Sequence, residues 1–113
     1  LRLGGVALDL LVDPVTRTLP LTDRDAAGLV RAVRGSELMT GERGTGDVAA
    51  LEELLLRVAA LADLLPQVAE LVLDPVLVQR RGAVPLHAGV RLLPPGSDPE
   101  RGPRRLGSSY AIL

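Results

Sequence analysis

The chain contains no cysteine, lysine, phenylalanine or tryptophan, and it has a single histidine and a single tyrosine. Without cysteine there is no disulfide framework, no thiol nucleophile and no cysteine-based zinc site. Without lysine there is no Schiff-base amine and no P-loop lysine. One histidine excludes a metal site built from several histidines of this chain.

Long apolar runs are also lacking, since none reaches the roughly 18 residues of a membrane span. Nothing at the start is typical of a signal peptide, so we expect a cytoplasmic protein with no membrane partner. The first residue is Leu1 rather than methionine, and we therefore expect a piece of a longer protein.

Charge of one sign is not in excess, because 13 basic residues stand against 14 acidic ones and give a net charge of −1. This balance argues against non-specific nucleic-acid binding, which needs a basic excess. With 113 residues, 47% of them hydrophobic, the chain is the size of one domain or part of one. Its core has to be built from Leu, Val and Ala.

The first helix signal lies at Thr22, which can cap a helix while Asp25 reaches back to the Thr22 amide. Gly35 marks the expected end of this helix. The residues expected on its buried side are Ala26, Leu29, Val30 and Val33.

A second, longer helix is expected to begin after Asp47, whose carboxylate can cap it, and to end at Pro66. On its outer side Glu53 and Arg57 have the spacing of an ion pair. The buried stripe predicted from helical periodicity consists of Val48, Leu51, Leu55, Val58, Ala62 and Leu65, widened by Leu54 and Leu61.

Apolar, partly β-branched segments bounded by turn signals predict the strands. We expect the first two to form a hairpin, and Asp74-Pro75 to separate the third from the fourth. The predicted strands are Gly4–Val12, Val15–Leu19, Val68–Leu73, Val76–Val78 and Ala83–Leu93.

This order of elements predicts an α/β lobe of the α+β kind, in which a mixed, mostly antiparallel sheet packs against two helices over residues 1–93. From Pro94 onward the composition shifts to Pro, Gly, Ser and Arg. We expect a disordered, flexible tail over 94–113, in which Tyr110–Leu113 is too short to fold alone.

Two glycine-rich segments could bind an anion. The amides of Gly4-Gly5, before the first strand, could approach a phosphate, although such a pair is more often a turn. Arg43 lies in a glycine-flanked loop and could bind the same kind of group, although loop arginines are usually solvated. Neither segment is a Walker motif.

Asp74 and His87 form the most informative pair of polar residues. A hairpin centred between Arg80 and Arg81 would place them on adjacent strands, and Glu70 would share a face with Asp74 by strand alternation. A carboxylate and an imidazole in this arrangement could share a proton or a divalent cation. The alternative is a turn-forming aspartate before proline and a histidine bonded to a backbone carbonyl.

The run from Ala69 to Leu93, AELVLDPVLVQRRGAVPLHAGVRLL, resembles the end of the ATP-grasp domain of ADP-forming acyl-CoA synthetases, typified by AELDLNPVLV…GAVALDARVRL. Two upstream segments, GGVALDLLVD…RTLPLTDRDA and SELMTGERGTGDVAALEELLLRVAALADLLPQVAEL, resemble earlier parts of the same domain. The resemblance extends in order over about Leu3 to Pro94. It is closest in character to an arginine-rich actinobacterial form that is often fused to a GNAT-type acetyltransferase.

In that family the domain holds Mg-ATP between two lobes and passes a phosphoryl group, through a phosphohistidine on another domain, to or from an acyl phosphate and CoA. The resemblance implies that this chain is most of the C-terminal lobe, with ATP or ADP and Mg²⁺ as cofactors. Its implied partners are the N-terminal ATP-grasp lobe and the CoA-binding domain. The implied site residues are Asp74, His87 and Asp9 as metal ligands and Gly4, Gly5 and Arg43 as phosphate contacts.

The sequence departs from the family pattern at the implied ligands. The family's asparagine falls on Asp74 and its aspartate on His87, while Val72 and Gly89 replace an acid and an arginine. Asp74 can still bind Mg²⁺, but neutral imidazole is a poor ligand for it.

Three interpretations follow. The first is a fragment of an acyl-CoA synthetase-like protein that contributes the metal and phosphate side of an ATP site and is inactive alone. The alternative is a non-catalytic regulatory or interaction module of an acetyltransferase-fused protein, in which the helix Asp47–Leu65 packs on a partner. The third, an unrelated small α/β domain, would leave Asp74 and His87 far apart.

Overall fold

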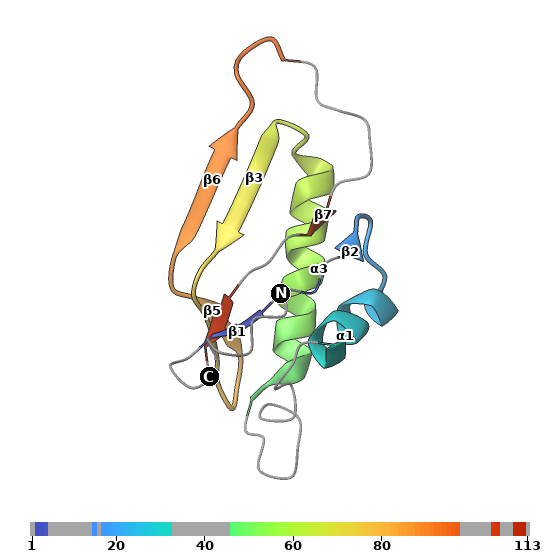
Figure 1. Cartoon of the computed structure of the whole chain (residues 1–113), viewed down its shortest axis with the longest axis vertical. Coiled ribbons are helices and arrows are strands. Elements are labelled where there is room, and N and C mark those ends of the chain that lie inside the picture. Colours follow the sequence, from blue (N-terminus) through green and yellow to red (C-terminus); the bar gives the residue numbers. More distant parts are fainter. Residues whose placement is uncertain are drawn as a thin grey trace.

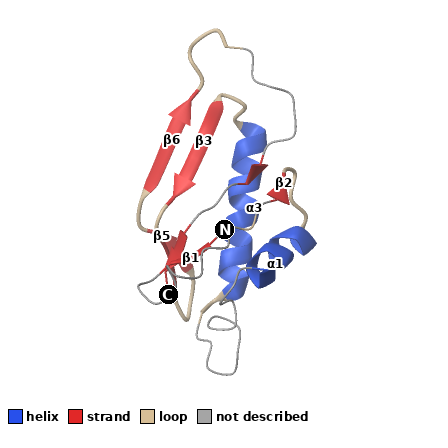
Figure 2. Cartoon of the chain, in the orientation of Figure 1, coloured by secondary structure: helices blue, strands red, loops and turns tan. Residues whose placement is uncertain are grey.

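The computed structural model of the chain describes residues 2–4, 15, 17–32, 46–97, 105–106 and 110–112. Two helices and eight short strands lie in this part of the chain (Figures 1 and 2). The helices are α1 (Asp23–Ala32) and α3 (Val48–Leu64). The strands are β1 (Arg2–Gly4), β2 (Arg17–Thr18), β3 (Val68–Leu73), β4 (Val76–Val78), β5 (Ala83–Pro85), β6 (Ala88–Leu92), β7 (Arg105–Leu106) and β8 (Tyr110–Ile112).

Helix α1 begins with reciprocal hydrogen bonds between Thr22 and Asp25. The Asp25 amide donates to Thr22 Oγ1 at 3.2 Å, and the Thr22 amide donates to Asp25 Oδ2 at 2.9 Å. The Thr22 hydroxyl donates to the same carboxylate oxygen at 2.7 Å. This capping box satisfies amides at the helix start and confirms the predicted beginning of the helix. The predicted end at Gly35 lies outside the described residues.

Helix α3 begins after Asp47, whose Oδ1 accepts a hydrogen bond from the Ala50 amide at 3.0 Å. It ends before Leu65 and Pro66, because proline cannot continue the helical hydrogen bonds. The predicted start and end are confirmed. The predicted buried stripe is wrong at Leu61 and Leu65, which are 37% and 47% exposed, and Leu65 also follows the last helical residue.

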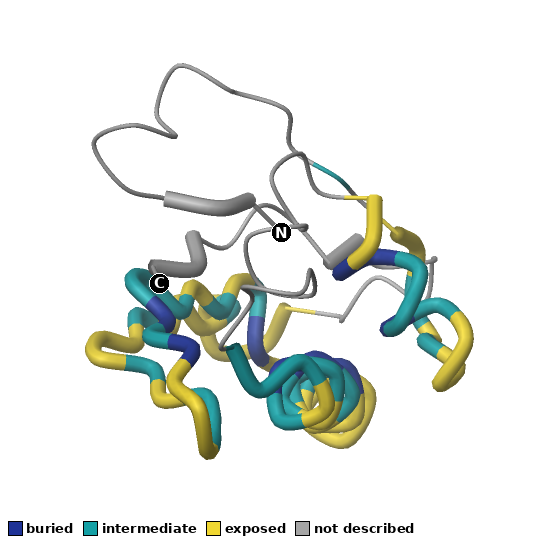
Figure 3. Tube along the Cα trace, turned by 90° about the horizontal axis from the view of Figure 1, so that it is seen from below, coloured by how far each residue is buried: buried dark blue, intermediate teal, exposed yellow. Residues whose placement is uncertain are grey.

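One side of α3 is buried and the opposite side is exposed, as Figure 3 shows in a view nearly along the helix axis. The predicted ion pair between Glu53 and Arg57 lies on the exposed side. The buried residues of the helix are Leu51, Leu55 and Ala59.

A long hairpin runs from β3 to β6 and stands beside α3 in Figure 1. Strand β3 pairs antiparallel with β6, and β4 pairs antiparallel with β5. Both pairs keep one register, centred between Arg80 and Arg81, from the Val78–Ala83 pair to the Glu70–Arg91 pair. The predicted hairpin and its centre are confirmed.

Both limbs of the hairpin are interrupted at the same level. The outgoing limb breaks at Asp74-Pro75, as predicted, and the bond between these two residues is cis. The returning limb was expected as one strand over Ala83–Leu93, but it is divided at Leu86 and His87, directly opposite that break. A proline has no amide to offer the ladder, so the interruption on one limb is matched on the other.

The strands form three small sheets in the described part of the chain, where one sheet was expected. The order in the four-stranded sheet is β1-β8-β4-β5, while β2–β7 and β3–β6 form two-stranded sheets. Strand β8 is parallel to both β1 and β4, and the other pairs are antiparallel.

The hairpin predicted for the first two strands lies largely outside the described residues and stays a prediction. The described part of Gly4–Val12 is the end of β1, which pairs with β8, and the described part of Val15–Leu19 contains β2, which pairs with β7. Residues 5–14 lie outside the described ones. Two short strands, β7 and β8, lie within residues 94–113, where a flexible tail was expected, and they pair with β2, β1 and β4.

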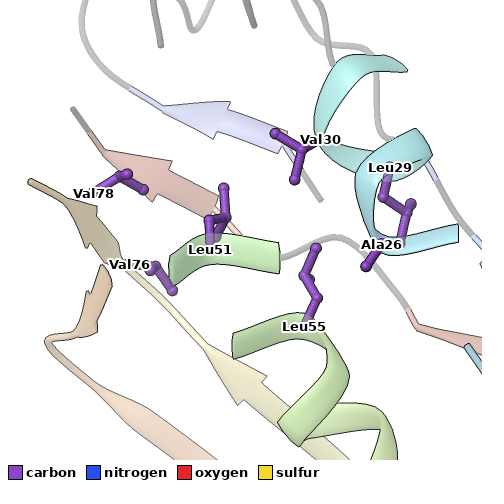
Figure 4. Packing of buried hydrophobic residues seen from close by; sticks show 7 residues of the cluster. All are labelled: Ala26, Leu29, Val30, Leu51, Leu55, Val76 and Val78. Atoms are coloured by element: carbon purple, nitrogen blue, oxygen red, sulfur yellow. The ribbon is translucent and has the colours of Figure 1, made fainter. Parts of the chain in front are cut away.

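The core is a cluster of aliphatic side chains between α1, α3 and β4 (Figure 4). All its members are Ala, Leu or Val, as the composition predicts. In Figure 4 the side chains of α1 point toward α3, and those of β4 approach the start of α3 from the other side. The cluster consists of Ala26, Leu29, Val30, Leu51, Leu55, Val76 and Val78. This packing holds β4 in place, and β4 is the strand of the hairpin that directly follows Asp74-Pro75.

Two helices with small, mainly antiparallel sheets define an α+β fold, which confirms the predicted class. Neither of the helices described here has the length and apolar character needed to cross a lipid bilayer.

Candidate functional site

Asp74 and His87 lie directly opposite each other at the break in the hairpin. The Asp74 amide donates to the His87 carbonyl oxygen at 3.1 Å, and the Leu86 amide donates to the Pro75 carbonyl oxygen at 2.8 Å. The opposed pairs on either side, Leu73 with Ala88 and Val76 with Pro85, have the same register. The predicted proximity of Asp74 and His87 along the chain path is therefore confirmed.

The side chains of this pair are accessible. Asp74 and His87 lie between two antiparallel ladders, in which opposed residues carry their side chains on one face. Asp74 is half-buried and His87 is exposed. Within the described ranges, neither side chain has a hydrogen bond or an ion pair. The carboxylate and the imidazole are thus free to bind a further group.

The neighbouring positions of the hairpin do not add a third free donor. Val72 is opposed to Gly89, and Glu70 is opposed to Arg91. The Glu70 carboxylate accepts a hydrogen bond from Arg91 Nε at 3.1 Å. The predicted common face of Glu70 and Asp74 stays a prediction, and the Glu70 carboxylate is paired with Arg91.

Most of the other predicted site residues lie outside the residues that the structure describes. Asp9, Gly5 and Arg43 are outside the described residues. Gly4 ends β1 and is paired with Ile112 of β8. The roles expected for these residues at a cation or a phosphate remain predictions.

Sequence reasoning missed the contact that holds the hairpin turn. Asp47 Oδ2 accepts a hydrogen bond from the Gly82 amide at 2.8 Å, and the Asp47 amide donates to the Gln79 carbonyl oxygen at 2.7 Å. These are the two backbone groups that a two-residue turn usually joins to each other. Gly82 has a φ of 93°, a conformation that favours glycine.

The same hydrogen bonds affect the ionisation of Asp47. The Gly82 amide, followed by the Ala50 amide, lowers the pKa of the Asp47 carboxyl below its ordinary value of 3.8, because both bonds stabilise the charged form. A capping aspartate was visible in the sequence, but its second partner lies 35 positions away and leaves no local signal. Asp47 thus acts on the geometry of the hairpin and does not contribute directly to the pair Asp74 and His87.

The side chains of Asp74 and His87 are not a well-matched pair of ligands for Mg²⁺. Mg²⁺ prefers oxygen ligands arranged in an octahedron. The Asp74 carboxylate can supply such an oxygen ligand. The imidazole of His87 suits Zn²⁺, Co²⁺ and Ni²⁺ instead. Among the residues that the structure describes, no group of three acidic or histidine side chains gathers around a common point. Of the two side chains, the Asp74 carboxylate is therefore the one that suits Mg²⁺.

Comparison with known proteins identifies the class. The ATP-grasp domain family matches residues 1–92, so the chain belongs to the ATP-grasp family. The match spans the confirmed helices, the hairpin and the Asp74–His87 pair.

Within that family the chain is similar to ADP-forming CoA ligases. It is 43% identical over 89 residues to acetate–CoA ligase [ADP-forming] II of Archaeoglobus fulgidus, covering 78% of this chain and 13% of the relative. It is 31% identical over 94 residues to the β subunit of acetate–CoA ligase [ADP-forming] II of Pyrococcus furiosus, covering 80% of this chain and 40% of that subunit. A 4-hydroxybutyrate–CoA ligase [ADP-forming] of Nitrosopumilus maritimus is 30% identical over 84 residues, 73% of this chain and 12% of the relative.

The chain therefore spans well under half of the length of these relatives. No solved structure matches it.

Proposed function

We propose that this chain is the C-terminal lobe of an ATP-grasp domain in an acyl-CoA synthetase-like protein of the ADP-forming type. The observation that carries the proposal is the opposition of Asp74 and His87 across the hairpin. These are the positions at which the resemblance implies the ligands of the nucleotide-bound cation. The homology to ADP-forming acetate–CoA ligases supports the same assignment.

ATP-grasp domains in general bind ATP or ADP together with Mg²⁺. In the proposed site Asp74 is the principal oxygen donor toward the cation, and Asp9 and His87 are the other candidates. The amides of Gly4 and Gly5 and the side chain of Arg43 face the phosphates. The lobe is built around residues 1–93, and strands β7 and β8 of the segment 94–113 pair with its strands β2, β1 and β4.

The proposed parent protein supplies the remaining parts. An N-terminal ATP-grasp lobe closes over the nucleotide, and a CoA-binding domain and a phosphohistidine carry the acyl and phosphoryl groups. We infer a fused GNAT-type acetyltransferase from the arginine-rich character of the sequence, and a cytoplasmic location from the use of ATP and CoA. The lobe alone lacks most of the reacting groups, so it forms no acyl-CoA.

One observation favours a second candidate function, a non-catalytic regulatory or interaction module. Helix α3 ends in leucines that its own core does not cover, since Leu64 is 77% exposed and Leu65 is 47% exposed. Val72 and Gly89 are also uncharged where the family pattern has an acid and an arginine. In this alternative the end of α3 packs on another domain of the parent, and the nucleotide site is lost.

A calorimetric titration of the parent protein with Mg-ATP separates the two functions. The proposed site predicts saturable binding that Asp74→Ala abolishes or weakens by at least about tenfold. The matched control is Asp63→Ala, which removes an exposed carboxylate on α3 and should leave binding unchanged. No binding by the unaltered protein would favour the module. Acyl-CoA formation by the purified 113-residue chain would contradict the proposed division of labour.

A further inference from the structure

The acidic side chains of the described region differ in how far they are already engaged. The carboxylates of Asp25 and Asp47 bind helix-start amides, and those of Glu53 and Glu70 are paired with arginines. Asp74 has no such partner in the described ranges, and it is the carboxylate opposed to the chain's single histidine. The hairpin thus presents an unpaired oxygen donor and an unpaired nitrogen donor at one level.

The backbone holds this level of the hairpin on both sides. The Asp74 amide is bonded to the His87 carbonyl oxygen, and the Leu86 amide is bonded to the Pro75 carbonyl oxygen. Of the two side chains, the His87 imidazole decides which divalent ion is preferred, because its nitrogen binds transition metals better than it binds Mg²⁺. A mixed nitrogen and oxygen donor set favours first-row transition metals over Mg²⁺, in the order that runs from Mn²⁺ up to Cu²⁺.

We propose that Asp74 and His87 together bind a divalent transition-metal ion of the Co²⁺ or Zn²⁺ type in preference to Mg²⁺. This inference rests on the proposed function, because it names the cation preferred at that same site. Two protein donors leave the other coordination positions of the ion open to water, or to the phosphate oxygens of a nucleotide. Glu70 does not complete the site, because it lies four residues before Asp74 and its carboxylate is paired with Arg91.

The test titrates Co²⁺ alone into the 113-residue chain and follows the imidazole proton signals by NMR. Because the chain has one histidine, these signals belong to His87 without ambiguity. We expect Co²⁺ to shift and broaden them in a saturable way and Zn²⁺ to reverse the effect by competition. Mg²⁺ should compete at least about tenfold less well than Zn²⁺.

Variants show whether both donors take part. Asp74→Asn should weaken Co²⁺ binding at least about tenfold while the His87 signals remain observable. Asp63→Asn, an exposed acid on α3, should leave the affinity unchanged. His87→Gln, followed by calorimetry with Zn²⁺, should lose the same binding event. The inference is overturned if Co²⁺ does not affect the His87 signals, if Asp74→Asn binds as well as the unaltered chain, or if Mg²⁺ competes as well as Zn²⁺.

The parent protein separates this inference from the proposed function. If it binds Mg-ATP in an Asp74-dependent way while the His87 signals of the chain ignore Co²⁺, the metal preference is wrong and the nucleotide site stands. If the chain binds Co²⁺ through both residues while the parent binds no nucleotide, the metal preference stands and the nucleotide site is wrong.

Discussion

The carboxylate of Asp47 accepts a hydrogen bond from the Gly82 amide at 2.8 Å, although the two residues are 35 positions apart in the sequence. The other carboxylate oxygen caps α3 through the Ala50 amide, and the Asp47 amide binds the Gln79 carbonyl oxygen. One residue therefore connects the start of the long helix to both sides of the hairpin turn. This connection orients the limbs that carry Asp74 and His87.

Replacing Asp47 by alanine should weaken both elements that it joins. The Asp47→Ala change removes the helix cap and leaves the Gly82 amide without its partner, so we expect a melting temperature lower by about 4–8 °C. Thermal unfolding followed by circular dichroism measures this change. The Gly82 amide should also exchange with solvent faster than in the unaltered chain.

The control for this prediction is Asp63→Ala, which removes an exposed carboxylate from the same helix. Its melting temperature should match that of the unaltered chain. Equal melting temperatures for Asp47→Ala and Asp63→Ala would show that Asp47 does not hold the helix and the turn together.

Stability should decrease in acid because of Asp25 and Asp47. The Thr22 hydroxyl, followed by the Thr22 amide, lowers the pKa of Asp25 below 3.8, and the Gly82 amide does the same for Asp47. A carboxyl whose folded pKa is depressed adds stability that is complete above its unfolded pKa. That stability is lost as the pH falls through the lower, folded value. We therefore expect the loss of stability to begin near pH 3.8 and to continue at lower pH.

Urea unfolding between about pH 6 and pH 2 checks this dependence. The Asp25→Asn and Asp47→Asn double variant should have a flatter profile in the acid range, since its side chains no longer titrate. A double variant with the same acid-induced loss as the unaltered chain would assign that loss to other carboxyls.

The two ends of α3 should respond differently to the same substitution. Leu51 is fully buried in the core, so Leu51→Ala should lower the free energy of unfolding by about 2–5 kcal/mol. Leu64 is 77% exposed, so Leu64→Ala should change it by less than about 0.5 kcal/mol. Chemical denaturation of both variants measures the difference. Similar losses would mean that the leucines at the end of α3 are covered in solution.

The Glu70–Arg91 pair should contribute little to stability. Both side chains are more than half exposed, at 54% and 66%, so the solvent screens their attraction. A double-mutant cycle with Glu70→Gln and Arg91→Gln should give a coupling free energy of about 0.2–1 kcal/mol. The coupling should shrink as salt is added, and a coupling that is insensitive to salt would contradict a simple surface ion pair.

Much of the local structure could be predicted from the sequence, because its causes lie within a few residues. The capping pattern of Thr22 and Asp25, the start of α3 after Asp47 and the symmetric hairpin around Arg80-Arg81 all depend on short-range spacing. The pairing of Asp74 with His87 followed from the hairpin centre alone.

The parts that could not be predicted depend on contacts between distant segments. No local pattern indicates that β8 lies between β1 and β4, or that Asp47 binds Gly82. The exposure of Leu65 also escaped prediction, because helical periodicity continues past the residue at which Pro66 ends the helix. The division of Ala83–Leu93 followed from a break on the opposite limb.

The uninterrupted register of the hairpin has a consequence for how such a chain can vary in length. Asp47 ties down both sides of the turn, so the loss of one residue between Gln79 and Gly82 would slide one limb along the other. Asp74 would then meet a different residue, and the alternate positions of that limb would change faces. Evolutionary insertions and deletions are therefore expected to fall outside the span from Glu70 to Arg91.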